Sequence, residues 1–405
     1  MKKTKLAIVL THPVQYHAAV FRELAKYKEL DLTVFFGSTH GSTSSFDEEF
    51  GVSFKWDCNV LRGYKSVFIS QGGLQDLRKY RSAYRLAKKT ANEIKKFNPE
   101  HVLIMGYVPI YYYFLTIFLK KQKRHLLFRA ETTDKAKKRG KIKSTFRQYF
   151  LKEFYLNFDH FFAIGVNSRE HFLEHLVQRS QITTCQYSVD TNFVRKQVRK
   201  YLPKRSAIRK KLGIDLGNFV IMFCGKMIDK KNPLMITKAL LLLDKKSLER
   251  IFLVAVGEGE LREQFEKKAK EVLGKRVHFS GFKNQTQIGE YYSAADLLVL
   301  PSKRDETWGL VVNEALEYSL YCVVSDRVGC GKDLIKSGKN GGIFKYNDPK
   351  DLSAKIEKCM KTIIFKKTQL PTENKTAAAI YNSISADQEN SSKPNVKIIN
   401  SRRDS

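Results

Sequence analysis

The sequence lacks the features that mark several common classes of protein. Its six cysteines form no C-x-x-C pair and no Cys/His cluster of zinc spacing, which argues against a disulfide framework and a structural metal. The longest apolar stretch, residues 108–119, falls short of the ~20 residues that span a bilayer. No D-x-D sequence occurs, so the usual carboxylate clamp for a nucleotide-bound divalent ion is missing. We therefore expect no metal and no tightly bound cofactor.

Acidic residues are scarce as well. The chain has 41 Asp and Glu against 73 Lys and Arg, which gives a net charge of +32. Such a surface attracts anions over distances near the Debye length of about 10 Å. Nucleic acid, anionic lipid and phosphorylated substrates are all compatible with this charge. The motifs have to decide among them, and a basic nucleic-acid-binding protein stays open as an alternative.

Apolar runs of strand length alternate with amphipathic segments along most of the chain, the pattern of parallel sheets with helical crossovers. A length of 405 residues exceeds one compact core. We expect an α/β fold with one domain over 1–200, a second over 201–361 and a poorly patterned, mobile tail over 362–405. Strands are predicted at 6–10, 32–36, 101–105, 125–128, 160–164 and 183–187, and then at 219–224, 251–256, 277–279, 297–300 and 322–325.

The most informative segment joins a buried strand to a helix over residues 301–316 and contains Glu306 and Glu314. In doubly wound folds, ligands bind beyond the carboxyl ends of the strands, where a starting helix offers free N–H groups. The two carboxylates lie about 12 Å apart along the helix axis and within roughly 80° of one face. They can thus reach opposite ends of one extended ligand, such as a sugar and a ribose. Spacing alone also allows a plainer interpretation, an N-terminal helix acid followed by a solvated helix residue.

Two further loops follow strands of the second series. Residues 224–233 combine Gly225 with Lys226 and Lys231, which suits a diphosphate because glycine admits a phosphate close to the backbone and lysine neutralises its charge. Gly257 lies in a similar turn that is too short for a dinucleotide fingerprint. Taken singly, the first loop is compatible with a solvated basic turn and the second with a turn that binds nothing.

The order and spacing of these segments resemble glycosyltransferase family 4, the retaining GT-B group, over nearly all of residues 204–351. The resemblance implies two doubly wound Rossmann-like domains facing each other across a cleft. It also implies metal-independent, hexosyltransferase-like transfer of a sugar from a nucleotide diphosphate, which is a co-substrate. Lys226 and Lys231 would hold the diphosphate, Glu314 the ribose and Glu306 the sugar, and the catalytic residues would be Glu306, Lys226 and Lys231. The implied donor site comprises Gly225, Lys226, Lys231, Gly257, Phe282, Asn284, Glu306, Thr307, Trp308, Gly309, Leu310 and Glu314.

The first domain is similar to a bacterial branch of the same family. Segments 11–17 and 128–132 each follow a predicted strand and would line the cleft where the acceptor enters. They supply the acceptor-side candidates His12, Gln15, His17, Arg129 and Glu131. Both histidines titrate in a range suited to a catalytic base. We favour a hydrogen-bonding role in the cleft wall, because a retaining transfer in this family needs no conventional histidine base.

A basic segment over residues 135–158 carries apolar and aromatic residues in the manner of an amphipathic helix. It is compatible with a helix lying on an anionic membrane leaflet and equally with an ordinary surface helix. The predicted function is sugar transfer to a glycan or lipid-linked glycan in surface polysaccharide or lipopolysaccharide synthesis. The predicted location is cytoplasmic, peripheral at the inner face of the plasma membrane. The alternatives are a nucleic-acid-binding protein, or a GT-B-fold sugar-nucleotide epimerase or inactive homologue.

Overall fold

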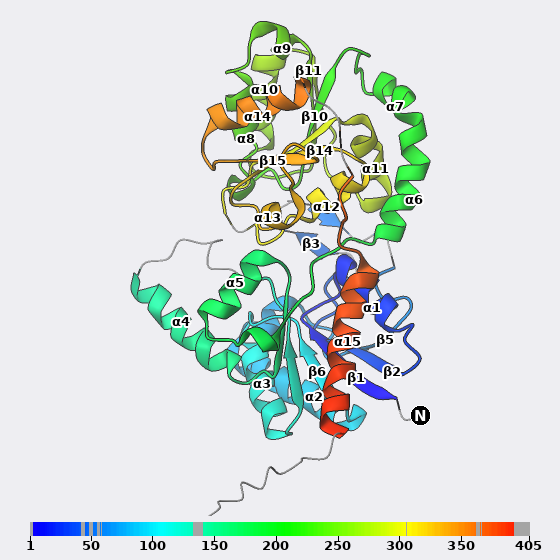
Figure 1. The fold of residues 1–405 in the computed structure, drawn as a ribbon, viewed down its shortest axis with the longest axis vertical. Helices are drawn as coiled ribbons and strands as arrows, with labels where there is room; N and C mark the ends of the chain where they lie inside the picture. Colours follow the sequence, from blue (N-terminus) through cyan, green and yellow to red (C-terminus); the bar gives the residue numbers. More distant parts are fainter. Residues whose placement is uncertain are drawn as a thin grey trace, which may run out of the picture.

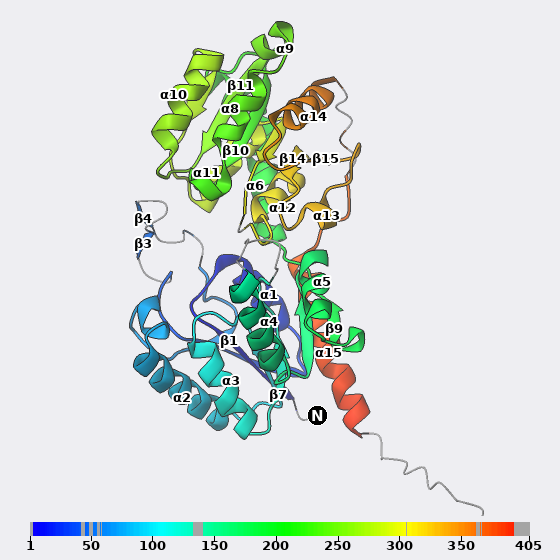
Figure 2. The same ribbon diagram turned by 90° about the vertical axis from the view of Figure 1, so that its left-hand side faces the viewer.

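Two α/β domains make up the protein, one above the other in Figure 1. The computed structural model describes residues 3–41, 45–47, 52–54, 57, 59–132, 141–304, 306–361, 365 and 367–392. Each domain is built on one parallel sheet, as the alternating pattern predicts. A short antiparallel pair, β3 (Ser45–Asp47) and β4 (Val52–Phe54), projects from the first domain (Figure 2).

The sheet of the first domain has seven parallel strands in the order β5-β2-β1-β6-β7-β8-β9. Its central strands are almost continuous apolar runs, because helices cover both of their faces. The edge strand β5 is absent from the sequence-based prediction, since its four half-exposed residues carry little apolar signal. The strands are β1 (Thr4–Leu10), β2 (Leu30–Phe36), β5 (Lys65–Phe68), β6 (His101–Ile104), β7 (His125–Phe128), β8 (His160–Ala163) and β9 (Ile182–Thr184).

Four helices pack on one face of this sheet and two on the other. The first face contacts α2, α3, α4 and α5 through buried aliphatic and aromatic side chains. The opposite face contacts α1 and the last helix of the chain, α15. The bounds are α1 (Gln15–Leu24), α2 (Tyr80–Phe97), α3 (Tyr111–Lys121), α4 (Lys141–Tyr155), α5 (Val166–Glu174) and α15 (Glu373–Ser392).

The sheet of the second domain has six parallel strands in the order β12-β11-β10-β13-β14-β15. One face packs on α8, α10 and α14, and the other on α6, α7, α11 and α12. The strands are β10 (Phe219–Cys224), β11 (Ile251–Val256), β12 (Val277–Phe279), β13 (Leu297–Leu300), β14 (Tyr321–Ser325) and β15 (Gly341–Phe344). The helices are α6 (Thr191–Tyr201), α7 (Arg205–Lys211), α8 (Leu234–Leu240), α9 (Lys245–Glu249), α10 (Arg262–Leu273), α11 (Gln285–Ala294), α12 (Leu310–Glu317), α13 (Gly331–Leu334) and α14 (Pro349–Lys361).

The first crossing between the domains follows β9. Helix α6 falls within the range expected for the first domain, 1–200, yet it packs on α11 and α12 of the second. Its N-cap Asp190 accepts a hydrogen bond from the backbone N–H of Phe193 (2.9 Å) and pairs with Arg22 of α1 at 2.5 Å. One carboxylate thus caps a helix of the second domain and holds it to the first.

The second crossing lies in the tail expected over 362–405 to be poorly patterned and mobile, of which residues 365 and 367–392 are described, and there it corrects that expectation. Residues 373–392 form α15, which runs back along the first domain beside α1 (Figure 1). Its sequence shows almost no helical periodicity because alanine and serine make up much of it, and its buried face rests on Ala377, Ile380 and Ile384. The Glu373 carboxylate is 2% exposed and accepts hydrogen bonds from the backbone N–H and hydroxyl of Thr191 and from the side-chain amide of Asn192. The two crossings are therefore tied together.

Membrane-spanning helices were searched for in the described residues. None of the helices there combines the length and the apolar character that a bilayer crossing needs.

Candidate functional site

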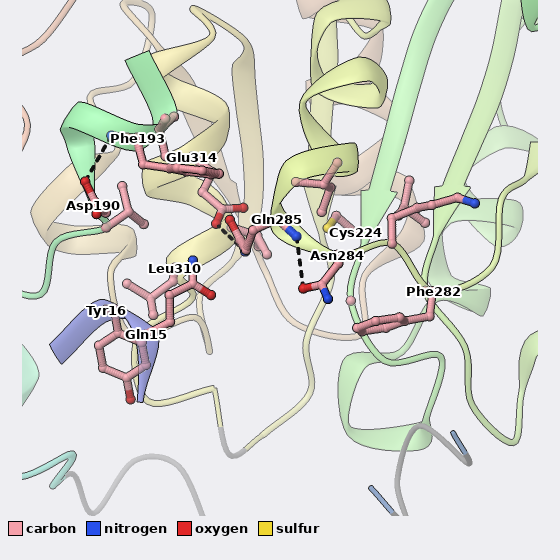
Figure 3. Close-up of a pocket in the computed structure, with 18 of the residues that line it drawn as sticks. Gln15, Tyr16, Asp190, Phe193, Cys224, Phe282, Asn284, Gln285, Leu310 and Glu314 are labelled. Carbon is pink, nitrogen blue, oxygen red and sulfur yellow. Dashed lines mark hydrogen bonds between the residues drawn. The ribbon is translucent and has the colours of Figure 1, made fainter. Parts of the chain in front are cut away.

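The carboxyl ends of the two sheets face each other, and a pocket of about 270 Å³ lies between them (Figure 3). Residues of both domains line it, because the start of α1 contributes Gln15 and Tyr16 while α12 contributes Leu310 and Glu314. Five residues predicted for the donor site, besides Leu310, also line it: Gly225, Gly257, Phe282, Asn284 and Glu314. The structure thus gathers the three sequence motifs at one cavity.

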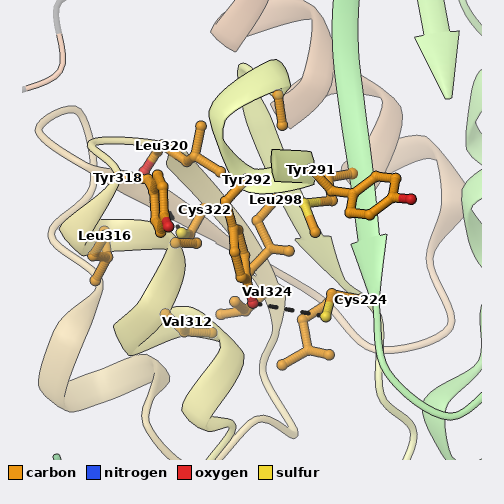
Figure 4. Close-up of a cluster of buried hydrophobic side chains, with 14 of the residues drawn as sticks. Cys224, Tyr291, Tyr292, Leu298, Val312, Leu316, Tyr318, Leu320, Cys322 and Val324 are labelled. Atoms are coloured by element: carbon orange, nitrogen blue, oxygen red, sulfur yellow. Dashed lines mark hydrogen bonds between the residues drawn. The ribbon is translucent and has the colours of Figure 1, made fainter. Parts of the chain in front are cut away.

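Glu314 lies at one end of this pocket, and it is not the solvated residue that spacing alone allows. It is 8% exposed, and its carboxylate accepts hydrogen bonds from the hydroxyl of Tyr292 (2.7 Å) and the amide of Gln285 (3.3 Å). Tyr292 reaches it from the aromatic core of the domain, where it also lies against Cys224 (Figure 4). Burial raises the pKa of Glu314, and both hydrogen bonds oppose that rise. The carboxylate is held rigidly, with its remaining lone pairs available to a ligand.

The two glycine turns form the pocket floor. The backbone N–H of Gly225 donates to the carbonyl of Val256 (3.0 Å), and that of Gly257 donates to the carbonyl of Gly281 (3.0 Å). Gly257 has a φ of +135°, and a Cβ there would lie 2.0 Å from the carbonyl oxygen of Gly225. Only glycine fits, so the two backbones approach closely and leave an open cradle next to Lys226.

Lys231 and Glu306 meet in the structure, although 75 residues separate them in the chain. The Lys231 ammonium donates to the Glu306 carboxylate, which also accepts from the hydroxyl of Ser302 (2.9 Å). A backbone hydrogen bond from Lys303 to Lys230 (2.8 Å) joins the two loops beside this pair. Glu306 lines a different pocket, of about 200 Å³, from the one that holds Glu314. The binding of one extended ligand by both glutamates stays a prediction.

The loop that leads into α12 contributes mainly backbone. Gly309, with a φ of +103°, begins the helix, and no side chain caps it. The Trp308 side chain is 3% exposed, donates to the amide oxygen of Asn313 (2.9 Å) and packs against Tyr187, so it supports the loop from within the protein. Only the backbone of Trp308 can therefore face a ligand, and the uncapped N–H groups at Gly309 and Leu310 suit a phosphate.

A third pocket, of about 290 Å³, lies on the first domain and contains most of the acceptor-side candidates. His12, His17 and Glu131 line it. Gln15 instead lines the pocket that holds Glu314, and Arg129 is 1% exposed beneath the surface. The Arg129 guanidinium donates to the carbonyl of Cys185 (3.1 Å) and lies 4.5 Å over the ring of Tyr187. Arg129 therefore supports the pocket wall.

Both histidines are neutral at physiological pH. Burial, with His40 nearby, lowers the pKa of His12 to about 4, and burial together with Arg129 places the pKa of His17 well below its usual range. The hydroxyl of Thr11 lies 2.8 Å from Nδ1 of His12. Imidazoles whose pKa is lowered in this way suit hydrogen bonding to a substrate hydroxyl, and that role stays a prediction.

Glu131 joins the two domains at the boundary between the pockets. One carboxylate oxygen accepts from the hydroxyl of Tyr16 (3.0 Å) and the other from the hydroxyl of Thr307 (2.6 Å), the neighbour of Glu306. Tyr16 lines both the pocket that holds Glu314 and the pocket of the first domain. A group passing from one pocket to the other therefore passes this contact.

Several residues of the site were not predicted. Asp190 and Phe193, at the first crossing between the domains, line the pocket that holds Glu314. Three tyrosines line the pocket of the first domain: Tyr107, Tyr112 and Tyr187. None of them belongs to a motif, and only their positions after apolar strands or at a helix start hint at the site. Across the described ranges, no group of three or more His, Cys, Asp or Glu side chains is placed to hold a metal ion.

Comparisons with known proteins agree with this geometry. Residues 204–375 match the family model described as glycosyl transferases group 1. A Campylobacter jejuni protein, GalNAc-alpha-(1->4)-GalNAc-alpha-(1->3)-diNAcBac-PP-undecaprenol alpha-1,4-N-acetyl-D-galactosaminyltransferase, is 32% identical over 148 residues, 36% of this chain and 40% of that protein. The match therefore spans less than half the length of this relative.

Solved structures match nearly the whole chain. A glycosyltransferase from Rickettsia africae superposes with a TM-score of 0.67 at 15% identity, covering 97% of this chain and 100% of that one. HepE from Anabaena, in complex with UDP-glucose, superposes with a TM-score of 0.63 at 16% identity over 96% and 99%. These likenesses establish the fold, and the predicted GT-B arrangement is confirmed. The chain thus has the GT-B fold, and its residues 204–375 are similar to the group 1 glycosyl transferases.

Proposed function

We propose that this protein transfers a sugar, with retention at the anomeric carbon, from a nucleotide diphosphate to a glycan or lipid-linked glycan. The observation that carries the proposal is the sharing of Tyr16 by two pockets. One pocket is lined by the family's motifs, and the other is rich in tyrosine with neutral histidines. Aromatic faces and hydrogen-bonding groups together suit a sugar ring.

In this proposal the second domain binds the donor. Glu314 accepts from the ribose diol, the cradle beside Gly225 and Gly257 admits the diphosphate, and Glu306 orients the sugar. The acceptor oxygen replaces the diphosphate at the anomeric carbon, and its proton leaves with the departing phosphate. Lys226, Lys231 and the N-terminus of α12 stabilise the charge that develops on the diphosphate. We propose that these groups suffice without a metal ion.

For the acceptor, one comparison favours a lipid-linked glycan. The Campylobacter jejuni relative carries such an acceptor in its name, a glycan on undecaprenol diphosphate. A role in surface polysaccharide synthesis, and a location at the inner face of the plasma membrane, follow from that acceptor. Both belong to the proposal.

Nucleotide release from a panel of UDP, GDP and ADP sugars tests the donor part, with and without EDTA. We expect release from one nucleotide class, unchanged by EDTA, and a loss of at least tenfold in Lys231→Ala. Lys303→Ala is the matched control, because Lys303 pairs with the exposed Asp229 at 2.5 Å rather than with Glu306. No release from any donor would overturn the proposal, and an epimerised sugar without transfer would support the epimerase alternative.

A further inference from the structure

The exposed aromatic side chains of the described residues are concentrated on one part of the molecule. All six that are both aromatic and exposed lie on α2, α3 and α4 of the first domain: Tyr80, Tyr84, Tyr113, Phe146, Tyr149 and Phe150. Phe146 is 75% exposed and Tyr149 68%. We call these six residues, with the exposed Val108, Ile110 and Ile117, the aromatic face. A contiguous surface of this kind signals an interaction site.

Ring contacts make the aromatic face continuous across the three helices. Tyr80 of α2 lies 5.0 Å from Phe114 of α3, and Tyr113 of α3 lies 5.6 Å from Phe150 of α4, between ring centroids. The three helices lie together on the side of the first domain that Figure 2 presents. Residues 133–140 lie outside the described residues, and the described part of the amphipathic segment over 135–158 contributes Phe146, Tyr149 and Phe150 to a wider surface that includes α2 and α3.

The helices that carry the aromatic face are predominantly basic. The sequences of α2, α3 and α4 contain twelve Lys and Arg and only two acids, Glu93 and Glu153. Arg81 and Arg85 are exposed beside Tyr80 and Tyr84. Aromatic rings among basic side chains match the interface of an anionic bilayer, where rings enter the headgroup region and cations meet lipid phosphates.

The aromatic face adjoins the mouth of the first-domain pocket. Val108 is 68% exposed and also lines that pocket, together with Tyr107. The Arg147 guanidinium of α4 donates to the Tyr107 hydroxyl (3.1 Å) and joins the face to the pocket rim. From there the pocket runs to Glu131, which contacts the donor loop through Thr307.

We propose that the aromatic face docks on an anionic membrane and presents the mouth of the first-domain pocket to the lipid surface. The acceptor is then an amphiphile whose sugar enters the pocket beside Tyr107 while its hydrocarbon anchor stays in the bilayer. This inference rests on the proposed function for the identity of the acceptor. The docking itself does not, and it can be measured separately.

Sedimentation with phosphatidylglycerol and phosphatidylcholine vesicles tests the docking. The full chain is expected to bind phosphatidylglycerol preferentially, and Phe146→Ser/Tyr149→Ser to bind at least about tenfold more weakly, because two aromatic anchors are lost. Leu241→Ser/Leu242→Ser removes two exposed apolar side chains of the second domain and should bind like the unaltered protein. Equal binding by the aromatic double variant overturns the proposal. So does a dimer, detected by sedimentation velocity without vesicles, that this variant dissociates.

Brominated phosphatidylglycerol tests the orientation. A tryptophan introduced by Val108→Trp is expected to be quenched in these vesicles, whereas one introduced by Leu241→Trp is not. Equal quenching of both, or of neither, contradicts the proposed orientation. Nucleotide release by the same preparations separates the two proposals. Release without vesicle binding overturns the docking alone, and vesicle binding without release overturns the proposed function alone.

Discussion

The two domains share one architecture but differ in how their sites are encoded. In the second domain, Gly225, Gly257 and Glu306 each lie in a short loop after a strand, and the parallel strands bring these loops to one edge of the sheet. In the first domain, the pocket draws its tyrosines and histidines from three separate places, segments 10–17 and 105–112 and Tyr187, and only the first of these was singled out from the sequence. Chemistry that depends on backbone geometry leaves a local signature in the sequence. Recognition by side-chain surfaces does not.

The largest effect should come from Glu306, which lies in a motif loop of the second domain. Glu306→Ala removes the carboxylate that holds Lys231 and that orients the donor sugar in the proposed function, and we expect nucleotide release to fall roughly 10²- to 10³-fold. Asp229→Ala is the matched control, because Asp229 is half-exposed and pairs with Lys303 and Arg304. A decrease of less than threefold in Glu306→Ala would show that the donor loop does not perform the chemistry.

The pH dependence of folding stability compares His12 of the first domain with Glu314 of the second. The lowered pKa of His12 means that the unfolded chain binds a proton more readily, so His12 opposes folding as the pH falls from 6.5 to about 4, by about 3 kcal/mol. The raised pKa of Glu314 acts in the opposite direction, because its contribution is full below pH 4.5 and is lost as the pH rises.

Unfolding by urea between pH 7 and 4 checks this prediction. His12→Asn should lose less stability over that range than the unaltered protein, and Glu314→Gln should gain relative to it as the pH rises above 4.5. Parallel curves for all three proteins would contradict the assigned burial of both groups.

Glu373 tests whether the two crossings act as one unit. Glu373→Ala leaves the N-terminus of α6 without the acceptor for Thr191 and Asn192, and we expect a loss of about 2 kcal/mol in unfolding free energy. Asn374→Ala is the neighbouring control, because Asn374 is exposed. Equal stability of the two variants would mean that α15 is held by its apolar face alone.

The smallest effect should come from Trp308, which was predicted as a donor residue. Trp308→Phe loses the hydrogen bond to Asn313 but keeps most of the buried surface, so a stability loss of about 1 kcal/mol is expected. Nucleotide affinity, measured by calorimetry, should stay within twofold. A larger change in affinity would place the indole in contact with the donor.

The sequence predicts the second domain almost completely. Five of its six strands follow from apolar runs, and β15 (Gly341–Phe344) escapes because two of its four residues are glycine. The three motif loops are identified by composition and order, yet the pairing of Lys231 with Glu306 could not be predicted, because it depends on how the loops after β10 and β13 fold toward each other.

Prediction is weaker where burial comes from small residues or from distant partners. Helix α15 has only a narrow apolar stripe, since its buried apolar side chains are Ala377, Ile380 and Ile384. Glu131 and Tyr16 are both in segments singled out from the sequence, but their contact with each other and with Thr307 joins three elements from two domains. No pattern within one segment encodes such a contact.

The place of α15 in the chain also bears on how the protein is made. This helix covers the face of the first sheet formed by Leu6, Ile8 and Val34, but it follows the entire second domain in order of synthesis. During translation the first domain therefore waits, with part of its apolar core open to water, until about 190 further residues have been made, as counted from the end of β9 to the start of α15. Until then that face of the sheet is open to aggregation and to chaperones, and the packing of α15 covers it.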